Sequence, residues 1–210
     1  MRYEIKVPIF SDFNFIFEKW VRNSKGIRKH YGDRIVKSIY YDTHNFKNAK
    51  DNIDGISRRS KIRLRWYNDD FLKKKLEVKV KKNNLGEKIF LELENLKNIN
   101  DLKEVENTIL KKRYFINSEI KNNKDQVYKY IFDDLKPISM ISYNRSYFRF
   151  ENLIRITFDQ NICYHSFQND QKSMKKIKDH KNVIEFKFEQ KNLEVAKFLL
   201  DKLHLRPNRF

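Results

Sequence analysis

The sequence has few of the residues that cross-link or break a chain, with one cysteine, four glycines and three prolines among 210 residues. The single Cys163 excludes an intramolecular disulfide framework and any cysteine-rich zinc site. The scarcity of glycine and proline argues against a loop-dominated chain and favours long regular elements. No apolar run approaches the roughly 20 residues that a membrane-spanning helix needs, and the charged N-terminal residues lack the apolar stretch of a signal peptide. We therefore expect a soluble protein of the reducing cytoplasm.

Two familiar phosphate-binding loops are also absent. The chain contains neither Gly-x-x-x-x-Gly-Lys-Ser/Thr nor Gly-x-Gly-x-x-Gly, which excludes a P-loop site and a Rossmann site. The five histidines have no pairwise metal-binding spacing. Any phosphate or metal chemistry must therefore be carried by arginine, lysine and carboxylate side chains.

Acidic residues are outnumbered, 28 Asp and Glu against 46 Lys and Arg, for a formal net charge of +18. Such a charge attracts polyanions, whether nucleic acid, polyphosphate, nucleotides or an acidic membrane surface. Many lysines fit solvated faces, so the position of the arginines is more informative than their number. A hydrophobic fraction of 40% supports one folded domain over residues 1–210.

The hydrophobic periodicity predicts a single α+β domain with about eight mostly antiparallel strands. Residues 42–55 are expected to form a polar connection, and residues 168–181 a basic loop. Ser11 or Asp12 is the expected N-cap of the first helix. Strands are expected over 2–7, 34–41, 61–67, 73–82, from 87 onward, 138–150, 153–159 and 182–189, and helices over 11–23, 100–115, 125–134 and 193–203.

Five of these strands carry arginine or lysine on one face and apolar residues on the other, and all but one of them have a carboxylate beside the cations. Arg63 and Arg65, for example, alternate with Leu64, and Lys187 shares a face with Glu185. A single strand of this kind is an ordinary half-buried strand with one wet face. If the sheet closes with its apolar faces outward, the charges converge on an interior that is costly to build without an anion. The carboxylates would balance the cations or hold a divalent metal.

Six motifs in chain order resemble the VTC domain, the catalytic domain of the vacuolar transporter chaperone polyphosphate polymerases and their bacterial relatives. The resemblance extends from Arg2 to Arg209. No single motif is specific, but six in the same order are hard to obtain by chance. The motifs are 38–42 (Ser-Ile-Tyr-Tyr-Asp), 63–67 (Arg-Leu-Arg-Trp-Tyr), 77–79 with 86–88 (Glu-Val-Lys and Gly-Glu-Lys), 143–145 (Tyr-Asn-Arg), 155–159 (Arg-Ile-Thr-Phe-Asp) and 185–187 (Glu-Phe-Lys).

The resemblance implies membership of the triphosphate tunnel metalloenzymes. The implied fold is a closed antiparallel eight-stranded β-barrel with flanking helices, enclosing a basic tunnel. The implied reaction transfers the ATP γ-phosphate onto a growing polyphosphate chain, with Mn²⁺ or Mg²⁺. The implied catalytic residues are Arg63, Arg65, Lys79, Arg145, Arg155 and Lys187; the substrate-binding residues are Arg2, Lys6, Lys88, Arg209 and Tyr41; and the metal ligands are Glu185 and Glu4.

Two departures from the family pattern bear on activity. Arg2-x-Glu4-x-Lys6 is similar to the Glu-x-Glu-x-Lys strand of the superfamily with its first glutamate replaced. That replacement favours the polymerase branch over the thiamine-triphosphatase and class IV adenylate cyclase branch. The family ends in a segment resembling Phe-Ser-Lys, which residues 207–210 reach without the Ser and Lys. Either the sequence continues further or a tunnel lysine is lost, which would lower turnover.

Three other functions remain open from the sequence. A tunnel triphosphatase would use the same residues, with water in place of the phosphate acceptor. A non-catalytic module would bind polyphosphate or nucleic acid, although the aromatic residues lie mainly at apolar positions and no RNA-binding motif is present. A structural subunit of a polyphosphate complex is the third. The expected partners are ATP, polyphosphate and a separately encoded membrane protein, which would hold the chain at the inner face of a membrane.

Overall fold

The fold is taken from a computed structural model, which describes residues 2–82, 85–92, 135–166 and 176–205. The chain divides into two compact units. The first comprises Met1–Val36, Ser142–Tyr164 and Lys176–Phe210, and the second Lys37–Ile141 and His165–Lys175. The expectation of one domain over residues 1–210 stays a prediction.

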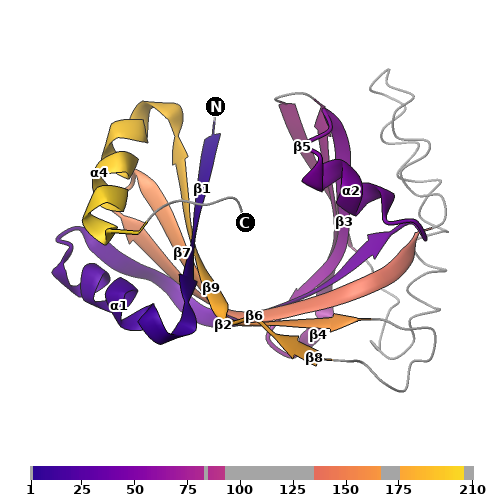
Figure 1. The fold of residues 1–210 in the computed structure, drawn as a ribbon, viewed down its shortest axis with the longest axis horizontal. Coiled ribbons are helices and arrows are strands. Elements are labelled where there is room, and N and C mark those ends of the chain that lie inside the picture. The colour runs from indigo at the N-terminus through magenta and orange to yellow at the C-terminus, as the bar shows by residue number, and fades with distance from the viewer. Residues whose placement is uncertain (1, 83–84, 93–134, 167–175, 206–210) are drawn as a thin grey trace. The chain divides into compact units, whose positions relative to one another are not determined.

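The described strands form one sheet in the order β1-β9-β7-β6-β2-β3-β4-β5, and β8 pairs with β7 (Figure 1). The eight-stranded antiparallel sheet with flanking helices is thereby confirmed. The path ends at β1 and β5, and no hydrogen bonds join these two strands among the described residues, so closure of the barrel stays a prediction. The strands are β1 (Arg2–Phe10), β2 (Ile27–Asp42), β3 (Arg58–Tyr67), β4 (Asp70–Lys82), β5 (Leu85–Glu92), β6 (Lys136–Phe150), β7 (Ile154–Ser166), β8 (Lys176–Lys178) and β9 (Lys181–Glu189).

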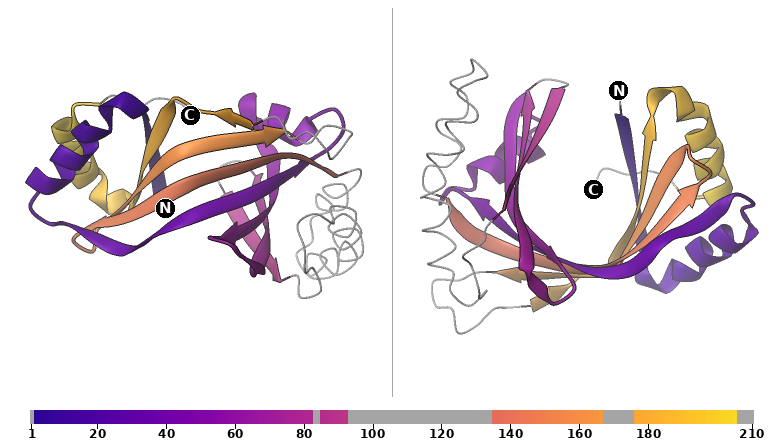
Figure 2. Two further views of the ribbon diagram at one scale, coloured as in Figure 1. Left: turned by 90° about the horizontal axis from the view of Figure 1, so that it is seen from below. Right: turned by 180° about the vertical axis from the view of Figure 1, so that it is seen from behind.

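In the first unit, α1 (Asn14–Asn23) and α4 (Leu193–Leu203) cover one face of β1, β9 and β7 (Figures 1 and 2). The core under them consists of alternate strand residues, such as Ile156 and Phe186, together with Phe17 of α1. The Phe17 ring lies 4.3 Å from that of Phe158. Each large apolar side chain buried in this way contributes about 1.5–3 kcal/mol. Because successive strand residues point to opposite faces, the residues between them lie on the face away from the helices.

Several boundaries differ from those expected. The helix predicted over 11–23 begins as a short 3₁₀ helix, η1 (Ser11–Phe13), and α1 starts only at Asn14. The predicted N-cap is wrong, because the cap residue of α1 is Phe13, which makes no side-chain cap hydrogen bond. The last helix is confirmed at 193–203, preceded by η3 (Gln190–Asn192). The helices predicted over 100–115 and 125–134 lie outside the described residues, and β8 occupies part of the expected 168–181 loop.

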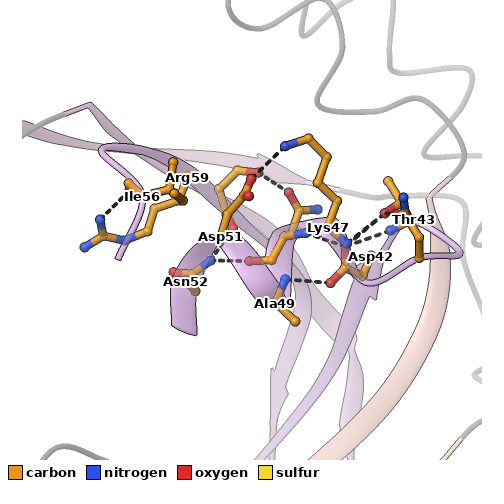
Figure 3. A network of polar contacts seen from close by, with 11 residues as sticks. Asp42, Thr43, Lys47, Ala49, Asp51, Asn52, Ile56 and Arg59 are labelled. Atoms are coloured by element: carbon orange, nitrogen blue, oxygen red, sulfur yellow. Dashed lines mark hydrogen bonds and ion pairs between the residues drawn. The ribbon is translucent and has the colours of Figure 1, made fainter. Parts of the chain in front are cut away.

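The expected polar connection over 42–55 contains a helix, α2 (Lys47–Ile53). Its amino end is held by Asp42, whose carboxylate accepts hydrogen bonds at 2.8 Å from the backbone N–H groups of Asn48 and Ala49 (Figure 3). The helix is tied to β3, because Asn52 donates to the Ser60 carbonyl and the Ser60 hydroxyl donates to Asn48. A buried carboxylate thus connects the end of β2 to a helix on β3.

Replacing Asp42 by alanine is expected to lower the free energy of unfolding by about 2–3 kcal/mol, because the freed N–H groups lose a charged acceptor in a buried position. The matched control is Asp51→Ala on the same helix. Asp51 forms an i,i+4 pair with Lys47 that should contribute well under about 1 kcal/mol. Chemical denaturation measures both variants. Equal stability of the two would contradict the role assigned to Asp42.

Candidate phosphate-binding site

In the second unit, the cations of β3 and β4 gather on one sheet face. Ile62 and Leu64 are fully buried on the other face, so Arg63 and Arg65 lie away from that core. The register pairs Arg63 with Glu77. One row further along, Lys61 pairs with Lys79, and Lys79 in turn with Lys88 of β5. Residues paired across antiparallel strands share a face. We call this set, with Tyr40 and Ser38 of β2, the β3–β4 cluster.

Arg63 is the most heavily bonded member of the β3–β4 cluster. Its Nε donates to Glu77 Oε2 at 2.6 Å, and its Nη1 donates to the Tyr40 hydroxyl at 3.1 Å. Burial would lower the pKa of Arg63, but Tyr40 and Glu77 outweigh burial and raise it. Burial would raise the pKa of Tyr40, but the Arg63 charge outweighs it, so the phenol pKa lies below its usual range. The guanidinium is therefore held permanently charged and in a defined orientation.

Glu77 is the carboxylate that interacts with several cations of this cluster. Burial would raise the pKa of Glu77, but the charges of Arg63, Arg65 and Lys88 lower it below its usual value. Lys88 Nζ lies 3.3 Å from Glu77 Oε1, and its pKa is lowered by burial and by the two arginines. Lys79 has no hydrogen bond or ion pair within the described part of the chain. Among the described residues, the cluster contains more cations than carboxylates, an arrangement that suits an anionic ligand.

Arg65 is buried, unlike most arginines, and its Nε donates to the Ser38 hydroxyl at 3.0 Å. A buried guanidinium has lost most of its water, so a phosphate group in front of it would be bound strongly. Arginine suits this role because its planar fork engages two phosphate oxygens at once.

In the first unit, a second set of charges lies on the sheet face opposite α1 and α4. The register forms one row from Glu4, Lys187 and Arg155, and a neighbouring row from Lys6, Glu185 and Thr157. Arg145 of β6 and Asp159 of β7 lie on the same face, since Phe148, three residues after Arg145, and Phe158, next to Asp159, pack in the core. We call this set the β9 cluster.

Glu185 is the buried carboxylate of the β9 cluster, with a side chain only 7% exposed. Burial would raise its pKa, but the charges of Lys187 and Arg145 outweigh burial and keep the pKa below its usual value. Lys187 Nζ lies 2.6 Å from Glu185 Oε1 and 3.5 Å from Glu4 Oε2. The glutamate is therefore ionised at neutral pH and lies near a second carboxylate.

The donor set of the β9 cluster fits a divalent cation. Glu185 Oε1 is buried and contacts the Lys187 ammonium at 2.6 Å, so the pocket around this oxygen already accommodates a positive charge. Thr157 lies directly opposite, and its Oγ1 is buried without a hydrogen-bond partner among the described residues. Carboxylate oxygens are the ligands that Mg²⁺ and Mn²⁺ prefer. No group of three or more acidic, histidine or cysteine side chains that could hold a metal occurs in the described ranges. Glu185 and Glu4 would therefore share the ion with phosphate oxygens and water.

Arg145 and Asp159 form a bidentate ion pair in the β9 cluster. Nε and Nη2 of the arginine each donate to a different carboxylate oxygen at 2.6 Å, and the two side chains are 15% and 11% exposed. Burial would lower the pKa of Arg145, but Asp159 outweighs it and raises the pKa. The Tyr143 ring lies 5.2 Å from the guanidinium carbon. Asp159 occupies the Nε–Nη2 edge of the guanidinium, so the side that carries Nη1 remains for a ligand.

The structure separates the residues expected from the sequence into these two clusters. Tyr41 is 2% exposed in the core, whereas Tyr40 beside it contacts Arg63. Arg2 lies in β1 opposite Glu189, and nothing is described of its side chain. Arg209 lies outside the described residues. The β3–β4 cluster contains Arg63, Arg65, Lys79 and Lys88, and the β9 cluster contains Glu4, Lys6, Arg145, Arg155, Glu185 and Lys187.

The cluster residues that were not predicted as site residues include three with uncharged hydroxyls, namely Ser38, Tyr40 and Thr157. Alternation in the sequence indicates their face, since Ser38 and Tyr40 are two apart and Thr157 is two from Arg155. Their uncharged hydroxyls made them resemble ordinary strand residues. Only the contacts show that two of them orient arginines.

Solved proteins of very different sequence share the fold. A proposed adenylate cyclase of Vibrio parahaemolyticus matches with a TM-score of 0.51 at 14% identity, covering 100% of this chain and 93% of that one. A proposed adenylyl cyclase of Hippeastrum, described as having a dominant triphosphatase activity, matches with a TM-score of 0.51 at 14% identity, covering 96% of this chain and 88% of that one. At this identity the likeness shows the fold alone. No curated protein matches the sequence.

The fold is therefore a helix-flanked antiparallel sheet of the type found in these proteins. The family is shown separately, because the model of the VTC domain matches residues 3–210. The chain belongs to the VTC domain family, which confirms the resemblance seen in its six motifs and agrees with the triphosphate tunnel superfamily. None of the helices in the described ranges is long and apolar enough to cross a membrane.

Proposed function

We propose that this protein is a polyphosphate polymerase that transfers the γ-phosphate of ATP to the end of a polyphosphate chain. The observation that carries the proposal is the buried, charged lining of the β3–β4 cluster, where the Tyr40 and Ser38 hydroxyls orient Arg63 and Arg65 and Glu77 pairs with Arg63. Such a surface suits a ligand with several adjacent negative charges. Membership of the VTC domain family supports ATP and polyphosphate as that ligand.

The chemistry asked of the protein is binding, orientation and charge stabilisation. A terminal oxygen of the acceptor chain attacks the γ-phosphorus of ATP, the bond from that phosphorus to the bridging oxygen breaks, and ADP leaves with the electron pair. The chain grows by one phosphate, and the acceptor oxygen needs no protein nucleophile. Arg63, Arg65 and Lys79 would bind phosphate oxygens and stabilise the charge that develops on them.

Glu185 and Glu4 would hold a divalent cation, which supplies charge neutralisation on the phosphate oxygens. Arg145, oriented by Asp159, would bind further oxygens on the same sheet face, together with Arg155, which has no hydrogen bond or ion pair within the described ranges. Lys187 pairs with both glutamates and would offset their mutual repulsion in the absence of the ion. The proposed cofactor is Mn²⁺ or Mg²⁺.

Phosphorus NMR of the protein incubated with ATP and Mn²⁺ tests the proposal. We expect a growing signal of internal chain phosphates with matching ADP. Arg65→Ala should reduce that signal at least about 100-fold, because its guanidinium stabilises the transferring phosphate. The matched control is Arg22→Ala on the exposed face of α1, which removes the same charge. Wild-type turnover in Arg65→Ala would contradict the role of the β3–β4 cluster.

The second candidate function is hydrolysis of tripolyphosphate or nucleotides. It is favoured by the triphosphatase activity described for the Hippeastrum protein of the same fold. The same residues would serve, with water as the attacking group. Orthophosphate without internal chain phosphates in the NMR experiment would support it over polymerisation. Binding of polyphosphate without any turnover would instead favour a non-catalytic module.

A further inference from the structure

A basic pocket lies on the first unit, beyond the residues of the β9 cluster. It has a volume of about 550 Å³ and is lined by Gly26, Arg28, Lys29, His30, Arg149, Glu151 and Asn152. These residues come from the start of β2, the end of β6 and the turn that follows β6. Three cations and a histidine face one carboxylate there, so the pocket favours an anion.

Arg149 is the pocket residue with a buried N–H group, its Nε, that lacks a hydrogen-bond acceptor among the described residues. Arg28 likewise has no hydrogen bond or ion pair within the described ranges, whereas Lys29 is paired with Asp33 at 2.8 Å. A buried guanidinium N–H that is not bonded carries a desolvation penalty. A phosphate group in the pocket would relieve it with charge-assisted hydrogen bonds.

The pocket continues the sheet face of the β9 cluster. Phe148 and Phe150 pack against the helix-covered core, so Arg149 between them lies on the opposite face. Ile27 is buried in the same core, which places Arg28 on that opposite face as well. Arg145 on β6 contacts Asp159 on β7, and the two strands are neighbours that run in opposite directions. Four residues after Arg145 and four before Asp159, Arg149 therefore lies beside Arg155.

A row of cations therefore crosses four neighbouring strands, from Lys187 on β9 through Arg155 and Arg149 to Arg28 on β2. Adjacent strands lie about 4.8 Å apart, so the row spans about 14 Å. A linear chain of phosphates has one negative charge at each unit and could follow such a row. An isolated phosphate would engage only one end of it.

Gly26, at the edge of the pocket, packs closely against Phe150 on the core side of β6. This glycine has a φ of +98°, and a Cβ added to it would lie 2.9 Å from the ring of Phe150. Any other residue would be strained there and would displace the ring that supports β6 next to Arg149.

We propose that Arg149, Arg28 and His30 form a subsite that binds phosphate groups of a polyphosphate chain beyond those held by the β9 cluster. The occupant rests on the proposed function, because it is the product of that reaction. The subsite itself is defined by the pocket, by Arg28 and by the buried Nε of Arg149, which have no hydrogen-bond partner among the described residues. These features do not depend on turnover.

Calorimetric titration with tripolyphosphate and with long-chain polyphosphate tests the subsite. Arg149→Gln and Arg28→Gln should each weaken long-chain binding about tenfold and leave tripolyphosphate binding unchanged. Glu151→Gln, which removes the carboxylate of the pocket, should strengthen long-chain binding. Arg22→Gln on α1 changes the net charge equally and should change neither affinity by more than about twofold.

Circular dichroism tests whether each variant is folded. If Arg149→Gln does not fold, Arg28→Gln still tests the subsite, because the Arg28 side chain is exposed. Unchanged long-chain binding in both variants, or equal weakening for the two ligands, would overturn the proposal. Polymerase activity is measured separately. If the wild-type protein made no polyphosphate, the proposed function would be refuted. If Arg149→Gln nevertheless weakened long-chain binding, the subsite would still be supported.

Discussion

Glu185→Gln is expected to reduce ATP turnover by about 10²–10³-fold without unfolding the protein. The glutamine fills the same volume but removes the negative charge that would hold the divalent cation beside Lys187. The buried Oε1, which contacts the Lys187 ammonium at 2.6 Å, is the atom that would bind the ion in exchange for that contact. Lys187 remains partly solvated, so loss of its partner should affect stability only slightly.

The matched control for this variant is Glu189→Gln, on the same strand and face but with a side chain 61% exposed. We expect the control to retain wild-type turnover. Binding of Mn²⁺ in the presence of tripolyphosphate should weaken in Glu185→Gln and not in the control. Wild-type turnover and Mn²⁺ affinity in Glu185→Gln would refute the assignment of the metal to the β9 cluster.

The second large effect is expected at Asp159. Asp159→Asn should lower the free energy of unfolding by about 3–5 kcal/mol, because it leaves the guanidinium of Arg145 buried without its counter-charge. Turnover should fall as well, since Asp159 orients Arg145 towards the face it shares with Glu185. Urea denaturation measures the stability change, and ATP turnover measures the effect on function.

Two further variants separate charge pairing from packing. Replacing the pair together, with Arg145→Met and Asp159→Leu, should restore most of the stability but not the turnover, because an apolar pair avoids the desolvation penalty. Glu194→Gln breaks the exposed pair with Lys197 and should change stability by less than about 1 kcal/mol. If Asp159→Asn were as harmless as Glu194→Gln, the buried pair would have no structural role.

The period of two in the sequence was sufficient to predict which residues share a sheet face. Arg63 with Arg65, and Glu185 with Lys187, lie together as their spacing requires, because side chains on a strand must alternate. The helix over 193–203 was equally predictable, since its apolar residues repeat at helical spacing. These features depend only on local geometry and on the need to bury apolar surface.

The helix α2 could not be predicted in the same way. It is seven residues long, has no apolar stripe, and is held by a carboxylate outside its own ends. The motif at 38–42 also could not show which tyrosine belongs to the site, because it contains both Tyr40 and Tyr41. Their roles depend on which side of β2 meets Arg63.

The sequence by itself determined the family, the alternating charged faces and most of the charged residues of both clusters, because these follow from residue order and strand geometry. Only the tertiary structure decided which charges are paired. Asp159 neutralises Arg145 and Glu77 is shared among three cations, whereas the buried Nε of Arg149 has no hydrogen-bond partner among the described residues. Pairing depends on which strands are neighbours and how deeply each side chain is buried, and strands distant in the sequence acquire that relation only through folding.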